Sequence, residues 1–180
     1  MYFYDGKAKK PAVKSVVLNE VKLKKNRDYT ISYKKNKNVG VATVTIKGKG
    51  NYKGTANATF EIKLKNGKVY VVGDYKYKVV YDDVMCVGFS GKPKSEVIIP
   101  DTVKIGGYKI DVWAINNKAF MGCNKITKLI VGKKVEAIGA KAFMNCKNLR
   151  VLKFEGNLYD VTLYNKAFEG IHPDFVVYSN

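Results

Sequence analysis

The residues best suited to chemistry in this sequence are three cysteines and one histidine. Cys86, Cys123 and Cys146 form no C-x-x-C pair, which argues against a zinc site because structural zinc ligands usually come in such pairs. They are also too few and too scattered for a disulfide scaffold. His172 precedes a proline, so we expect it in a loop, and no motif marks the nucleophile and acid that a catalytic triad would need. These four residues therefore predict no catalytic or metal site.

Other short motifs resemble functional signatures but lack the required context. The adjacent Asp82 and Asp83 would point to opposite faces of a strand, so we interpret them as a turn or a solvated edge. The stretch GKGNYKG at 48–54 misses the dinucleotide-binding spacing and opens no helix pattern. Asn57 begins a glycosylation sequon, which we attribute to chance within a predicted strand. We accordingly predict no enzyme, no cofactor-binding residues and no metal ligands.

Two of the cysteines lie in nearly identical phrases. NKAFMGCNKITKL begins at Asn117 and AKAFMNCKNLRVL at Ala140, 23 residues later. A third phrase, NKAFEGI, places another phenylalanine 25 residues after the second. A period near 23 falls in the leucine-rich repeat range, and such units must stack because one alone cannot cover its apolar face. We predict a solenoid in which Phe120, Phe143 and Phe168 form one continuous buried spine.

The elements around the phenylalanines repeat as well. VIIPDTV at 97–103 aligns with LIVGKKV at 129–135, and the stretch KIGGYKIDV between them is an insertion. Strands between Val69 and Phe89 would form a hairpin-rich cap on the open end of the solenoid. The turn-forming pair at 66–67 marks the junction with the preceding segment. The apolar positions expected in the ladders are Ile115, Ile126, Leu129, Val131, Ile138, Leu149, Leu152, Phe154 and Leu163.

The repeats from about 90 to 175 resemble the BspA type of leucine-rich repeats found in bacterial surface proteins. The family pattern Ile-Gly-x-x-Ala-Phe-x-x-Cys-x-x-Leu is intact from Ile138 to Leu149. In the coil before it, Asn116 replaces the glycine, and in the last coil Ile171 replaces the cysteine. Stacked coils would bring Cys123 and Cys146 close enough for a disulfide, although two reduced, buried thiols are the preferred interpretation.

Residues 1 to about 65 follow a different pattern. VATVTIKGK at 41–49, GTANATFEIKL at 54–64 and DYTISY at 28–33 alternate apolar and polar residues, as strands with one buried face do. AVKSVVL and VKL upstream supply further strands, and turn-rich segments separate the runs. This order, with YDG, DYT, NVG, GKGNYKG and FEI, resembles the bacterial immunoglobulin-like repeat, which implies a small β-sandwich.

The sequence thus predicts a mainly β protein with two domains. Residues 1–65 would form an immunoglobulin-like sandwich, and 66–180 a BspA-type leucine-rich repeat domain with a cap at about 66–93 and coils at about 94–180. The strand residues between the buried positions would share an outward face. They mix apolar and charged side chains, which suits protein recognition, although the face could equally be a plain sheet exterior or pack on the neighbouring domain. Its predicted members are Glu96, Ile98, Lys128, Ile130, Val151 and Lys153.

Charge supplies an alternative function. The chain carries a formal charge of +18 with 33 basic residues, only two of them arginine. Arginine dominates base recognition, so we expect no sequence-specific nucleic-acid binding. A lysine coat can keep strand edges apart or hold polyanions. Residues 1–66 hold 16 basic and 4 acidic residues, so this half could bind teichoic acid, heparan-like chains or DNA.

Three functional classes follow. The first is a non-catalytic, extracellular adhesion module of a bacterial surface protein, with host or bacterial surface proteins as partners, as the two resemblances imply. The second is an electrostatic binder of polyanions or glycans. The third, an enzyme accessory, has no supporting motif in the sequence. No apolar run approaches the length of a membrane helix, and the N-terminus lacks a signal-peptide core, so we expect targeting segments to lie outside this fragment.

Overall fold

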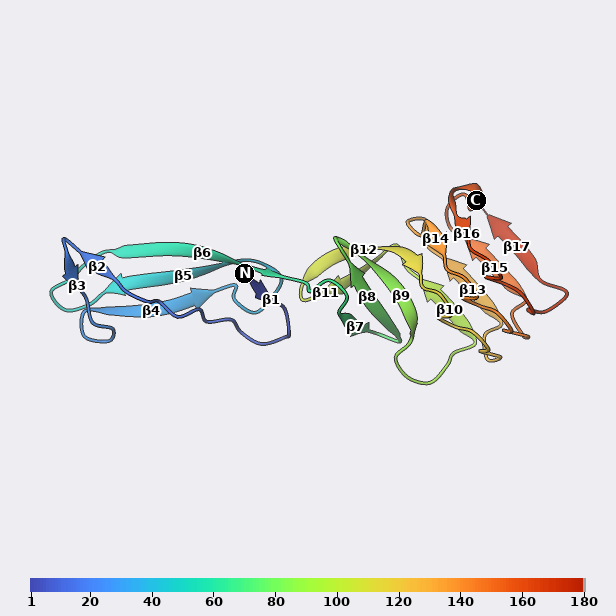
Figure 1. Ribbon diagram of the computed structural model, residues 1–180, viewed down its shortest axis with the longest axis horizontal. Coiled ribbons are helices and arrows are strands. Elements are labelled where there is room, and N and C mark those ends of the chain that lie inside the picture. Colours follow the sequence, from blue (N-terminus) through green and yellow to red (C-terminus); the bar gives the residue numbers. More distant parts are fainter. Residues whose placement is uncertain (180) are drawn as a thin grey trace. The chain divides into compact units, whose positions relative to one another are not determined.

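The computed structural model describes residues 1–179, which form two compact units (Figure 1). The first contains Met1–Lys65 together with Gly106–Tyr108, and the second contains Asn66–Ile105 and the chain from Lys109 onward. Both are built from strands, and the described residues include no α-helix. The predicted mainly β fold class is therefore confirmed.

The first unit consists of a four-stranded sheet and a separate two-stranded ribbon. The sheet has the order β1-β6-β5-β4 and is antiparallel, except that the short β1 runs parallel to β6. Its core includes Tyr29, Ala42, Val44 and Ile62, all buried. The strands are β1 Tyr2–Phe3, β4 Tyr29–Lys34, β5 Gly40–Gly48 and β6 Thr55–Lys63, and the ribbon pairs β2 Val17–Leu18 with β3 Val21–Lys22.

This unit differs from the sequence prediction in two respects. One sheet and a ribbon of two-residue strands are not two full sheets packed face to face, so the immunoglobulin-like sandwich is not confirmed. In β6 the expected buried face is present only near its end, where Ile62 is buried and Phe60 half-buried, whereas Ala56 and Ala58 are exposed. Alternation shows which residues share a face, but a face is buried only where another element covers it.

An ion pair fixes the turn that leads into β4. The Arg27 guanidinium Nε lies 2.7 Å from Oδ1 of Asp28, and Oδ2 of the same carboxylate accepts the backbone N–H of Lys24 at 2.7 Å. The hydrogen bond from Arg27, followed by that from Lys24, holds the pKa of Asp28 below its usual value. The aspartate of the DYT motif is therefore a structural residue.

The second unit is a β-solenoid. One parallel sheet has the order β10-β13-β15-β17, and a second runs β16-β14-β12-β9 before continuing antiparallel into β8 and β7. The first contains β10 Glu96–Ile99, β13 Lys128–Val131, β15 Val151–Phe154 and β17 Val176–Ser179. The second contains β7 Val69–Val72, β8 Tyr75–Val80, β9 Asp83–Phe89, β12 Tyr108–Ile115, β14 Ala137–Ile138 and β16 Thr162–Leu163.

The insertion and the cap region can both be followed in Figure 1. β11 Thr102–Ile105 pairs with β12 across the inserted residues. The strands β7, β8 and β9 form an antiparallel meander in the segment where the sequence predicts a hairpin-rich cap. A 3₁₀ turn at Leu158–Asp160 lies between β15 and β16.

The predicted phenylalanine spine is present. The ring centroids of Phe120 and Phe143 lie 5.1 Å apart and those of Phe143 and Phe168 lie 5.3 Å apart, with nearly parallel rings. Phe120 and Phe143 are buried, whereas Phe168 is half-buried. Phe89 extends the stack edge-on, 5.0 Å from Phe120. The 23-residue period is thus a packing requirement, because each ring covers the ring of the next coil.

Two backbone features explain the repeated phrase. Its lysine adopts a left-handed conformation each time, with φ of 57° at Lys118, 58° at Lys141 and 60° at Lys166. Gly139 lies so close to the coil before it that an added Cβ would be 2.5 Å from the backbone nitrogen of Asn117. The glycine of the repeat pattern is therefore needed for the close approach of two coils.

Candidate functional site

The six residues predicted to share an outward face do lie on one face of the parallel sheet. The strand register forms two rows, Glu96 with Lys128 and Val151, and Ile98 with Ile130 and Lys153. All six are exposed or half-buried, and the residues between them are buried. We call these six residues the recognition face; its binding role stays a prediction.

Sequence reasoning missed two residues that extend this face. β17 pairs in register with β15 and adds Val176 to the first row and Tyr178 to the second. Both side chains are exposed. The available signal was the apolar run FVVYS, which follows Phe168 by a similar distance as earlier strands follow their own phenylalanines.

The recognition face is largely apolar, because two of its three charged side chains form an ion pair with each other. Lys128 Nζ lies 2.7 Å from Oε1 of Glu96, so these two charges neutralise each other. Ile98, 47% exposed, and the half-buried Ile130 lie beside each other in the second row. Lys153 adds a positive charge to that row. An apolar centre with charges around it is the arrangement that protein interfaces use.

A shallow hollow of about 410 Å³ borders the face at Ile98. Its walls come from the β7–β8 turn and from the segment around β11, and include Val72, Pro100 and Val103. The Tyr75 hydroxyl accepts the backbone N–H of Ile98 at 3.0 Å, and burial raises the pKa of Tyr75. The backbone N–H of Ile98 is therefore already hydrogen-bonded to Tyr75 and is not available to a β-strand added at this edge. The hollow suits an inserted side chain better than an added strand.

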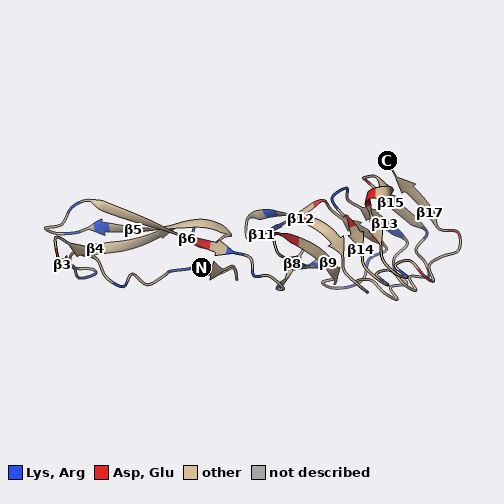
Figure 2. Ribbon diagram, turned by 45° about the horizontal axis from the view of Figure 1, so that its top comes forward, with Lys and Arg blue, Asp and Glu red and all other residues tan. Residues whose placement is uncertain are grey.

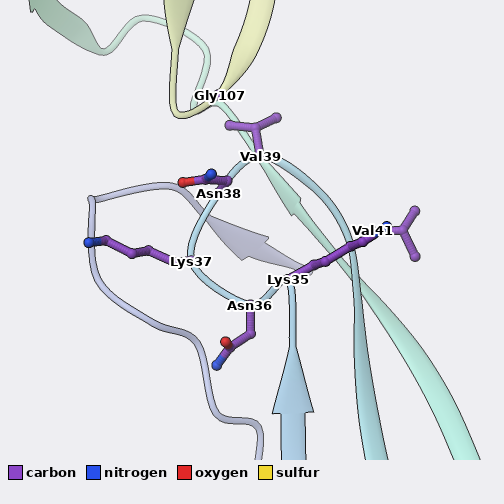
Figure 3. A pocket seen from close by; sticks show the side chains of 7 residues that line it. All are labelled: Lys35, Asn36, Lys37, Asn38, Val39, Val41 and Gly107. Carbon is purple, nitrogen blue, oxygen red and sulfur yellow. The ribbon is translucent and has the colours of Figure 1, made fainter.

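A second hollow adjoins the loop between β4 and β5, whose side chains Figure 3 shows. The residues that this loop and its neighbours contribute are Lys35, Asn36, Lys37, Asn38, Val39 and Val41. Lysine, asparagine and valine supply cations and amides but neither a general base nor a nucleophile near neutral pH. We assign no catalytic role to this hollow.

The three cysteines differ in their burial. Cys86 and Cys146 are buried, Cys123 is half-buried, and all three thiols are free. Burial raises the pKa of Cys86 to about 12 and that of Cys146 to about 11, so both stay protonated and unreactive. The Cys146 thiol donates to the Phe120 carbonyl oxygen at 3.0 Å. Cys86 and Cys146 are therefore core residues, whereas Cys123, which the sequence predicts to be buried, is only half-buried.

His172 and the acidic pair Asp82 and Asp83 lie in a loop and at the start of a strand. His172 Nδ1 accepts the backbone N–H of Asp174 at 3.1 Å in a loop. Asp83 begins β9 while Asp82 lies in the turn before it, and burial, with the nearby Asp111 carboxylate, raises the pKa of Asp83.

Among the described residues, no group of three His, Cys, Asp or Glu side chains could hold a metal ion. In the same part of the chain, no helix is long and apolar enough to cross a membrane.

A cluster of lysines lies at one end of the first unit, around the ribbon. Lys49 donates from its backbone to the Asp28 carbonyl and from Nζ to the Asn26 carbonyl, which joins the segment after β3 to the loop after β5. Figure 2 shows the basic residues in blue. We call this cluster the basic end. Its members, all exposed, are Lys22, Lys24, Lys25, Lys47, Lys49 and Lys53.

Comparison with known proteins identifies the solenoid. Residues 111–173 match the family model for the BspA type leucine rich repeat region, in six copies. This segment is similar to BspA-type leucine-rich repeats. The resemblance noted from the sequence is therefore confirmed for the C-terminal part, whereas the match does not reach the first unit. A search of curated proteins found no match.

Several solved structures have similar leucine-rich repeats. A leucine rich cell surface protein from Faecalibacterium prausnitzii has 18% identity and a TM-score of 0.44, covering 63% of this chain and 33% of its own. Leucine-rich repeat proteins from Bacteroides capillosus and Bacteroides ovatus have 21% and 22% identity and TM-scores of 0.48 and 0.46, each covering 62% of this chain. The matches span 98% of the B. capillosus chain but only 37% of the B. ovatus chain.

Proposed function

We propose that the chain is a non-catalytic, extracellular binding and adhesion module of a bacterial cell-surface protein. In this proposal, residues 1–65 act as an immunoglobulin-like stalk, and residues 66–180 present the recognition face to a host or bacterial surface protein. The observation that carries the proposal is the face itself, in which Ile98 and Ile130 lie together between a neutralised ion pair and Lys153.

The contacts of the face favour a protein partner over a small molecule. Its rows continue across four strands with β17, which gives an extended surface rather than an enclosed pocket. The hollow at Ile98 offers a place for one apolar side chain of the partner. Such an anchor beside a flatter, mixed surface is typical of the few residues that dominate protein interfaces.

The test measures binding of the full chain to immobilised matrix and epithelial surface proteins at physiological salt. We expect Ile98→Asp to lower the affinity at least about tenfold, as the loss of an anchor contact does. The matched control is Leu163→Asp, because Leu163 is also exposed, at 48%, but lies on β16 in the other sheet. Equal loss in both variants, or binding that disappears at moderate salt, would contradict the proposal.

The basic end supports a second candidate function, binding of polyanions or anionic glycans such as teichoic acid or heparan-like chains. Residues 17–53, which include all six lysines, contain only two carboxylates, Glu20 and Asp28, and Asp28 is buried and paired with Arg27. A compact group of unpaired cations attracts polyanions in a salt-dependent manner. We expect binding of the full chain to heparin to weaken steeply as salt rises, and salt-insensitive binding would exclude this function.

A further inference from the structure

The ribbon at the basic end exposes apolar side chains that a soluble protein surface would not need. Val17, Leu18 and Val21 are 57%, 48% and 53% exposed, although they lie within five consecutive positions. The register pairs Leu18 with Val21 and Val17 with Lys22, so apolar atoms lie on both faces of the ribbon. No strand of the four-stranded sheet pairs with it among the described residues.

The ribbon is held in place despite this exposure. Asn19 and Glu20 both have positive φ, 47° and 67°, as a two-residue hairpin turn requires. After β3, the Leu23 side chain is buried and its N–H donates to the Val16 carbonyl at 2.9 Å. The exposed valines and leucine therefore sit at the tip of an anchored hairpin and not in an unstructured loop.

Lysines adjoin this tip directly. Lys22 belongs to the ribbon, and Lys24 and Lys25 follow it immediately. The carboxylates nearby are Asp28, which is buried and paired, and the exposed Glu20 at the turn. An apolar tip beside a group of cations matches the chemistry of an anionic lipid bilayer, which offers hydrocarbon beneath a layer of negative charge.

We propose that the ribbon and the basic end form a binding site for an anionic lipid surface, with Val17, Leu18 and Val21 entering the interface and the lysines contacting the headgroups. This deepens the second candidate function, on which it rests, by naming the polyanion as a membrane.

Other occupants fit these observations less well. A soluble polyanion would satisfy the lysines but leaves the apolar tip in water. A second copy of the chain would bring two basic ends together, and like charges at close range repel. An anionic bilayer satisfies both groups of residues at once.

The test is co-sedimentation of the full chain with phosphatidylcholine vesicles, with and without phosphatidylglycerol, beside a parallel measurement of heparin binding. We expect binding to the vesicles that contain phosphatidylglycerol and little binding to phosphatidylcholine alone. Val17→Ser, Leu18→Ser and Val21→Ser combined should weaken vesicle binding by about tenfold or more and leave heparin binding unchanged. All three side chains are exposed, so the folded state should persist, which circular dichroism checks.

Charge variants locate the site. Replacing Lys22, Lys24 and Lys25 with Gln should weaken vesicle binding by about a hundredfold, since each cation near the surface contributes about fivefold. Glu20→Gln should strengthen binding by about fivefold for the same reason. The matched control replaces Lys34, Lys35 and Lys37 with Gln, which removes equal charge at the opposite end of the sheet, around the β4–β5 loop.

The vesicle and heparin measurements together distinguish the lipid inference from polyanion binding. Heparin binding with wild-type vesicle binding in the serine variant would overturn the lipid inference and leave polyanion binding standing. Absence of binding to both probes would overturn both. Equal loss in the two triple-lysine variants would show that charge acts without this site, which also overturns the inference.

Discussion

Burial, rather than spacing along the sequence, determines how reactive each cysteine thiol is. The thiol of Cys146 is enclosed by the coil that contains Phe120, whose carbonyl accepts its hydrogen bond, and Cys86 is fully buried on β9. The sequence already argues against zinc and a disulfide scaffold, because these usually need cysteine pairs at set spacings. It could not rank the three thiols by reactivity, since exposure depends on which side of a coil covers each of them.

We predict that alkylating reagents modify Cys123 well before Cys86 and Cys146 in the folded chain. The raised pKa values, to about 12 for Cys86 and about 11 for Cys146, keep these thiols protonated at pH 8 to 9. The measurement is iodoacetamide labelling followed by mass spectrometry, with and without denaturant. Because the native state holds these protons more tightly than the unfolded state, stability should fall as pH rises above about 9. Equal labelling of all three in the native chain would contradict the burial.

The ion pair at Asp28 predicts that stability falls as pH decreases, the opposite direction to the effect of the cysteines. Its pKa is lowered in the folded state by Arg27 and Lys24, so it contributes stability above the unfolded value of about 3.9, and this is lost as pH falls through the folded value. Asp28→Asn should therefore lower the melting temperature of the first unit at neutral pH. The difference from wild type should shrink in acid, and a constant difference from pH 7 to pH 2 would show that the charge contributes nothing.

Close contact between coils predicts the effect of two neighbouring substitutions. Gly139→Ala should destabilise the solenoid by about 1–3 kcal/mol, because the new Cβ would overlap the backbone of Asn117. Lys141→Gly should be neutral or stabilising by less than about 1 kcal/mol, since glycine adopts the observed positive φ without strain. Urea denaturation measures both, and a neutral Gly139→Ala would show that the coils can separate at this point.

At the level of elements, the phenylalanine stack should be strongest in its middle. Phe143 is buried between two rings, so Phe143→Ala should cost about 3–5 kcal/mol. Phe168 is half-buried, and its alanine variant should cost clearly less because it already contacts water. Chemical denaturation of the two variants gives the comparison, and equal losses would contradict the gradient of burial.

The elements predicted from periodicity were found where the repeat is regular. The offset of 32 between Val97 and Leu129 is the observed strand register. Ile115, Ile138 and Leu163 align as expected, but Leu163 is 48% exposed, so the buried ladder does not extend to the last coil. The last strand was missed because its coil lacks the cysteine of the pattern. The exposed Ala56 and Ala58 show the limit of alternation, which identifies a face but not whether another element covers it.

For the whole molecule, the two units lead us to expect two separable unfolding transitions. Each unit has its own buried residues, with Ala42 and Ile62 in the first and Leu129 and Phe143 in the second. Asp28→Asn should shift one calorimetric transition and Phe143→Ala the other. A single transition that both variants shift equally would show that the proposed division at 65 and 66 is not a thermodynamic boundary.

Charge divides the whole molecule in a way that the fold alone does not explain. The residues up to 66 hold 16 basic and 4 acidic side chains, whereas the rest hold 17 and 11. The sequence predicted this asymmetry directly, since it needs only counting. It could not predict that six lysines gather around an apolar hairpin, because that depends on how β3, β4 and β5 bring their ends together.

The hydroxyl of Tyr75 has a consequence for self-assembly. Parallel β-stacks with open edges can template strands from other molecules and grow into fibrils. At β10, an arriving strand would find the amide of Ile98 already occupied by a phenol. This hydrogen bond removes one donor from the edge of β10, a strand that also begins with the charged Glu96 and is followed by Pro100.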